Sequence, residues 1–210
     1  MMRRVHSTAS PEDRPFPAAN DGEIAEKANT LTVWKKSLLF NCRGFTVFDG
    51  KGKLVFRVDK YDTDHRDEIV LMDAAGTPLL AMRKKKLSLG DQWQVFDGEP
   101  RRSGVSPKPI YCVKKKASLL HPRTLAHVYS GSCKTFLYVV HDAYIRRSCQ
   151  VVDASGKVVA EVRAKESGAS GVSYRDVFQL MVQPDLDPSL PMALVLLLDQ
   201  MFPSKWSPVL

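Results

Sequence analysis

Short hydrophobic runs separated by turn residues make up most of the chain from Leu31 onward. The runs are four to six residues long, are rich in β-branched and aromatic residues, and are bounded by Gly, Pro, Asp and Ser. This pattern is typical of β-strands, and many strands at short intervals favour a sandwich or a barrel. It predicts strands over residues 31–35, 45–48, 54–58, 68–72, 78–83, 93–96, 110–114, 135–140, 149–152, 158–163 and 177–182.

A nine-residue pattern occurs three times and predicts β-hairpins. Each copy has two apolar residues, Asp, two small or polar residues, Gly, one further residue and two apolar residues. Asp can accept hydrogen bonds from the backbone of its own turn, and Gly adopts positive φ at little cost. The third copy begins 104 residues after the first, which suggests two related halves. We assign a structural role in these turns to Asp49, Gly52, Asp73, Gly76, Asp153 and Gly156.

The last hydrophobic stretch predicts a helix instead of a strand. Pro191 suits a first helical turn, and Pro203 ends the stretch. The residues between them are apolar on every face, so the helix must be buried all round or lie in a membrane. The longest apolar run, residues 192–198, is far shorter than the roughly 20 residues that span a bilayer. We therefore expect a barrel around a buried helix that contains Leu194, Val195, Leu196, Leu197 and Leu198.

The chain of 210 residues divides into a tail and one domain. Residues 1–28 are polar and contain three prolines, which predicts a disordered tail, and residues 29–210 form the barrel domain. The N-terminus has no apolar segment of the kind found in secretory signals, so we expect a soluble cytoplasmic protein. The four widely spaced cysteines are then expected to be reduced, buried thiols.

The charge distribution suggests an anionic partner. The whole chain carries +8, and residues 29–210 carry +9. Alternate residues of a strand share a face, so Lys84 lies beside Lys86, and Lys114 beside Lys116. If the two strands are neighbours, four ammonium groups converge into a site for a phosphorylated lipid headgroup. The alternative is that these lysines only protect a solvated sheet edge.

The sequence contains no pattern that indicates an enzyme. A Gly-x-Ser-x-Gly elbow and a P-loop are both missing, and the five histidines are scattered. The sequence also offers no recognition helix or aromatic RNA-binding motif for reading nucleic acid. We therefore expect no catalytic residues, no metal and no cofactor.

Several ordered motifs resemble the plant LURP-one-related family. They begin with Phe45–Asp49 and Leu54–Tyr61, continue through Val70–Leu80 and Trp93–Phe96, and end with Met192–Gln200. The resemblance covers residues 30–203 and implies the tubby carboxy-terminal fold shared with phospholipid scramblases. That fold is a closed barrel of about twelve antiparallel strands around one buried C-terminal hydrophobic helix.

The resemblance also implies a function. Tubby domains bind phosphoinositides through basic side chains and can move to the nucleus, and LURP-one-related proteins are linked to plant defence. This chain has no membrane-spanning segment after its helix, unlike scramblases. We therefore expect a non-enzymatic module that contacts anionic phospholipid, with cytoplasmic, peripheral-membrane and nuclear pools. The alternative is a scaffold or regulator that binds an unknown protein partner and no lipid.

Overall fold

The computed structural model describes most of the domain. The described residues are 28–39, 43–60, 68–86, 88, 90–98, 107–116, 123–142, 148–164 and 176–202. Residues 1–27, and with them nearly all of the predicted tail, lie outside the described residues.

Twelve antiparallel strands form a closed barrel, as predicted. Each strand pairs with its neighbours in the sequence, and pairing of the first strand with the last closes the barrel. The strands are β1 (Asn29–Trp34), β2 (Arg43–Phe48), β3 (Leu54–Lys60), β4 (Glu68–Asp73), β5 (Pro78–Lys84), β6 (Gln92–Asp97), β7 (Tyr111–Lys115), β8 (Thr124–Ser130), β9 (Phe136–Asp142), β10 (Cys149–Asp153), β11 (Val158–Ala164) and β12 (Val177–Val182).

The sequence pattern did not predict β8. Six of its seven residues are buried, because its inner face packs in the core and its outer face lies beneath neighbouring side chains. On the outer face, His127 and Tyr129 pack edge-on against Phe136 of β9. A strand that is covered on both sides, and that contains His and Thr, lacks the alternation of apolar and polar residues that identifies a half-exposed strand.

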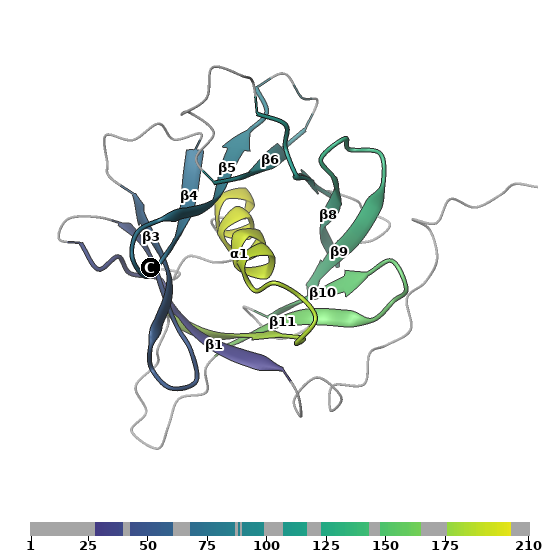
Figure 1. The fold of residues 1–210 in the computed structure, drawn as a ribbon. Helices are drawn as coiled ribbons and strands as arrows, with labels where there is room; N and C mark the ends of the chain where they lie inside the picture. The colour runs from purple at the N-terminus through teal and green to yellow at the C-terminus, as the bar shows by residue number, and fades with distance from the viewer. Residues whose placement is uncertain are drawn as a thin grey trace, which may run out of the picture.

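The helix α1 (Ser189–Met201) runs through the centre of the barrel (Figure 1). It begins where the Asp187 carboxylate accepts a hydrogen bond from the Ser189 backbone N–H at 2.9 Å. Each of the residues Leu194–Leu198 is at most 2% exposed, because the inward-facing side chains of the strands surround the helix. Burial on every side explains why the helix has no polar face. With 13 residues α1 is too short to cross a bilayer, and the part of the chain that the structure describes holds no other candidate.

The three sequence repeats form the β2–β3, β4–β5 and β10–β11 connections with one shared geometry. In the first, the Asp49 carboxylate accepts hydrogen bonds from the backbone N–H groups of Lys51 and Lys53, both at 2.8 Å. Gly52 has φ of +78°, where a side chain would be strained. A β-bulge lies beside each turn. These Asp and Gly residues shape hairpins at one end of the barrel.

The cysteines differ from the sequence prediction of reduced thiols. Cys112 of β7 and Cys133 form a disulfide, with their Cα atoms 5.5 Å apart. The β8–β9 connection can fold over β7 because Gly131 lies against the Pro109 carbonyl, where a Cβ would come within 1.6 Å of the oxygen. The two cysteines are 21 positions apart in the sequence, and only this fold brings them together. Cys149 is a buried free thiol, and burial raises its pKa to about 12.

Candidate functional site

Positive charge is concentrated at the barrel end where α1 finishes, which we call the basic end. We counted charges on the two residues of each strand nearest this end, on the described connections and on residues 199–202 of the helix. The basic end has six acidic residues, Asp59, Glu68, Asp91, Asp142, Asp176 and Asp199. Its thirteen basic residues are Lys35, Lys36, Arg43, Lys60, Arg83, Lys84, Lys85, Lys86, Lys114, Lys115, Lys116, Arg123 and Arg163.

The opposite end, which contains the three repeated hairpins, is close to neutral. The same count there gives five basic residues, Lys51, Lys53, Lys108, Lys134 and Lys157. The acidic residues are Asp49, Asp73, Asp97, Asp153, Asp185 and Asp187. Among the described residues, the excess of positive charge is therefore concentrated at one end of the barrel. Charge that served only solubility would be expected at both ends.

The register separates the lysines that the sequence analysis grouped together. Lys84 pairs with Trp93, and Trp93 pairs with Val113, so Lys84 lies on the inner face with two core residues. Lys114 is opposite Gln92 and His127 and faces outward, where its Nζ lies 4.6 Å from the centre of the Tyr129 ring. The sequence analysis made the convergence of the four lysines conditional on the two strands being neighbours, and that condition is not met. β6 lies between β5 and β7, and the two lysine pairs start on opposite faces of the sheet.

The alternative interpretation, protection of a sheet edge, also fails for a physical reason. A closed barrel has no edge strands, and both β5 and β7 are paired on both sides. The lysines at the ends of these strands lie at the barrel end instead.

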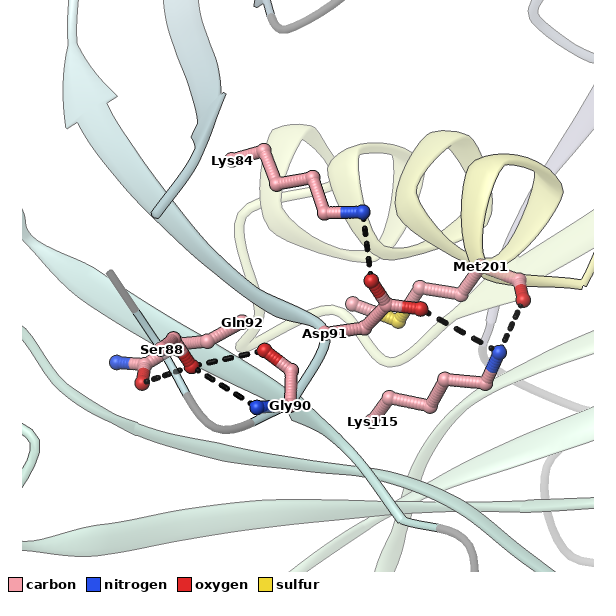
Figure 2. A network of polar contacts seen from close by, with 7 residues as sticks. All are labelled: Lys84, Ser88, Gly90, Asp91, Gln92, Lys115 and Met201. Carbon is pink, nitrogen blue, oxygen red and sulfur yellow. Dashed lines mark hydrogen bonds and ion pairs between the residues drawn. The ribbon is translucent and has the colours of Figure 1, made fainter. Parts of the chain in front are cut away.

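Two inward-facing lysines, Lys35 and Lys115, contact the end of the helix, and Lys84 is linked to Lys115 through Asp91. The Asp91 carboxylate lies between Lys84 and Lys115 and pairs with both (Figure 2). One of its oxygens is 2.7 Å from the Lys84 Nζ, and the other is 3.5 Å from the Lys115 Nζ. Lys115 also donates to the Met201 carbonyl at 2.6 Å, and its Nζ lies 4.5 Å from the centre of the Phe202 ring. On the other side of the helix, Lys35 pairs with Asp199 at 2.5 Å. A cation at a helix C-terminus stabilises the last carbonyl groups, so these lysines have a structural role.

This network predicts a pH dependence of stability. The hydrogen bond from Lys84, followed by the positive charges of Lys84 and Lys115, lowers the pKa of Asp91 below its ordinary value of 3.8. Because folding lowers this pKa, Asp91 stabilises the fold above pH 3.8, and the contribution disappears as the pH falls through the folded-state pKa. Urea unfolding should show wild type more stable than Asp91→Asn at pH 6, with a difference that shrinks below about pH 4. A difference that stays constant with pH would contradict this role.

A second set of lysines is exposed to solvent at the basic end. Among the described residues, Lys36, Lys85, Lys86 and Lys116 are exposed and belong to no ion pair. They follow the ends of β1, β5 and β7, so their side chains are not confined to one face of a strand. The lipid-binding residues expected from the sequence include Lys86 and Lys116 but not Lys36 and Lys85. The sequence did hold a signal for Lys36 and Lys85. Each comes shortly after an odd-numbered strand, and in an antiparallel barrel these strands all end on the same side.

Comparisons with known proteins agree with this fold. The family model described as LURP-one-related matches residues 29–199. Protein LURP-one-related 8 of Arabidopsis thaliana is 47% identical over 196 residues, which cover 90% of this chain and 96% of the relative. Protein LURP-one-related 17 of the same plant is 42% identical, with 95% of this chain and 96% of the relative covered.

A solved structure supports the architecture independently. The X-ray structure of an Arabidopsis thaliana protein superposes with a TM-score of 0.59 at 24% identity, covering 84% of this chain and 92% of that chain. At that identity the likeness shows the fold alone. The family match over residues 29–199 and the relatives that are more than 40% identical lead to one conclusion: the chain belongs to the LURP-one-related family.

Proposed function

We propose that this protein is a non-enzymatic binding module that docks on anionic phospholipid surfaces with its basic end. The observation that carries the proposal is the separation of charge along the barrel axis: among the described residues, one end has thirteen basic against six acidic residues, and the other has five against six. A membrane leaflet rich in anionic lipid attracts such an end and orients the barrel before contact.

The exposed lysines of the basic end supply the contact. Lys36, Lys85, Lys86 and Lys116 have no ion pair to break before they meet a phosphate. Each lysine near an anionic surface contributes roughly 1 kcal/mol, so four of them support reversible docking. Lys35 and Lys115, which contact the helix end, and Lys84, which pairs with Asp91, add positive potential to the same end of the barrel.

Family membership suggests where this docking matters. The cytoplasmic leaflet carries the anionic lipids, so the proposal places the protein there as a membrane-tethered regulator. We extend the proposal to a role in plant defence, with release toward the nucleus. This extension is supported by family membership and not by any feature of the basic end.

Vesicle co-sedimentation tests the proposal with the full chain. Three vesicles would be compared at about 0.15 M salt, where surface charges are screened beyond roughly 8 Å: neutral phosphatidylcholine, phosphatidylcholine with phosphatidylserine, and phosphatidylcholine with phosphatidylinositol bisphosphate at equal total charge. We expect binding to both anionic vesicles and none to the neutral one. Absence of binding to any anionic vesicle would overturn the proposal and leave the protein-binding scaffold as the function to pursue.

A further inference from the structure

Exposed hydrophobic side chains cluster at the basic end. Among the described residues, the large hydrophobic side chains that are exposed are Trp34 at 45%, Leu38 at 55%, Leu39 at 37% and Ile110 at 38%. The first three fall within residues 34–39, which finish β1 and start the connection to β2. Single exposed hydrophobic residues are common on proteins, but three in one short segment mark an interaction surface.

The 34–39 segment is fixed to the barrel wall. The Ser37 side chain, which is 6% exposed, donates to the Asp59 carboxylate of β3 at 2.5 Å. The Thr46 hydroxyl of β2 donates to the Lys36 carbonyl, and the Leu39 backbone N–H donates to the Ser37 hydroxyl at 3.0 Å. The exposed leucines therefore follow directly on two groups that are bonded to the barrel, the Lys36 carbonyl and the Ser37 side chain.

A glycine makes this attachment possible. Gly44 of β2 lies beneath the segment, and a Cβ there would come within 3.2 Å of the Ser37 Cβ and 1.8 Å of the Val58 carbonyl oxygen. Arg57 completes the support, because its Nε donates to the second oxygen of the Asp59 carboxylate at 2.7 Å. The contacts among Ser37, Asp59 and Arg57 thus hold the backbone next to Leu38 and Leu39, whose side chains stay exposed to solvent.

The segment combines apolar and basic groups in the way that membrane interfaces favour. Lys36 is exposed between Trp34 and the two leucines, and Lys35 reaches inward to Asp199. Trp is enriched at the boundary between headgroups and acyl chains, and Leu stabilises binding when it enters that boundary. A soluble polyanion would use the lysines but would give the exposed leucines nothing to contact.

We infer that the 34–39 segment inserts Leu38 and Leu39 into the interfacial layer of an anionic bilayer while the lysines of the basic end contact its headgroups. Trp34, whose ring packs edge-on against Phe48 on the barrel wall, lies at the edge of the inserted segment, within reach of the interface. This inference rests on the proposed function and adds that the partner is a bilayer, entered by a defined segment. The helix α1 then points its C-terminus toward the membrane, and the three repeated hairpins face away from it.

A leucine variant separates this inference from the proposed function. Leu38→Ser/Leu39→Ser removes two exposed side chains and should weaken binding to phosphatidylserine vesicles by about 10- to 100-fold at constant net charge. The matched control is Ile110→Ser, which changes a similarly exposed residue, 38% against 37% for Leu39, at the opposite end. The control should bind as wild type does.

Tryptophan fluorescence gives a second readout of insertion. The substitution Trp206→Phe leaves two tryptophans in the chain, Trp34 and Trp93. Trp34 is 45% exposed and Trp93 only 4%, so a quencher in the bilayer should act mainly on Trp34. Vesicles with brominated acyl chains should quench the signal of the Trp206→Phe protein and leave that of Trp34→Phe/Trp206→Phe unchanged.

The outcomes distinguish the two claims. If wild type fails to bind anionic vesicles, the proposed function fails and the inference fails with it. If wild type binds, but the double leucine variant binds equally well and Trp34 is not quenched, insertion is wrong and docking by charge alone remains. Loss of binding in the double leucine variant, together with quenching of Trp34 in the Trp206→Phe protein, supports insertion.

Discussion

Leu196→Asp is expected to prevent the barrel from folding. Leu196 is 1% exposed at the middle of a helix that packs against the inner face of the strands all round. The substitution loses the packing of a buried leucine, worth about 2–5 kcal/mol, and introduces a buried carboxylate without a partner, which costs several kcal/mol more. Domains are stable by only about 5–15 kcal/mol, so the sum exceeds or exhausts that margin.

Two companion variants make this expectation measurable. Leu196→Ala should stay folded with a free energy of unfolding about 2–5 kcal/mol lower in urea titration. Leu38→Asp, the same chemical change at a side chain that is 55% exposed, should unfold within about 1 kcal/mol of wild type. A soluble Leu196→Asp protein with a cooperative melting transition would contradict the position of the helix at the centre of the barrel.

Much of the fold could be predicted because local signals agreed. Residues 192–198 are apolar on every face, and a helix of that kind needs a surface around its whole circumference. The repeated Asp and Gly residues specify tight hairpins, which connect strands that are neighbours in the barrel. These features require no knowledge of long-range pairing. The strand β8 escaped prediction because burial on both faces removed the alternation that marks a strand.

The candidate site was less predictable because it depends on register. Simple alternation would place Lys84 and Lys86 on one face of β5, and Lys114 and Lys116 on one face of β7. Whether these two faces point inward or outward is set by the pairing of each strand with β6. That pairing turns Lys84 inward, where its ammonium group pairs with the Asp91 carboxylate. The Cys112–Cys133 disulfide was missed for a similar reason, since a connection distant in sequence covers β7.

The apolar 34–39 segment was hidden from the sequence by its resemblance to a strand. Trp34 belongs to β1, and Leu38 and Leu39 look like the start of another buried run. Their exposure follows from Ser37, whose burial against Asp59 turns the neighbouring leucines outward. Only the three-dimensional structure shows that the side chains of Trp34, Leu38 and Leu39 are exposed.

The most direct test of docking by the basic end compares two variants with equal charge. The first replaces Lys36, Lys85, Lys86 and Lys116 with alanine, and the second replaces Lys51, Lys53, Lys134 and Lys157, which are exposed at the opposite end. Each variant loses four positive charges, so a difference between them reports where the charge lies and not how much remains. Both sets consist of exposed side chains, so both proteins should melt close to wild type.

Binding to phosphatidylinositol bisphosphate vesicles at physiological salt is the quantity to measure. We predict that the basic-end variant loses about 100- to 1,000-fold in affinity, from roughly 1 kcal/mol per lysine near the surface, and that the opposite-end variant changes by less than about tenfold. Equal weakening of the two variants would mean that only net charge matters, and it would contradict a basic end that faces the membrane.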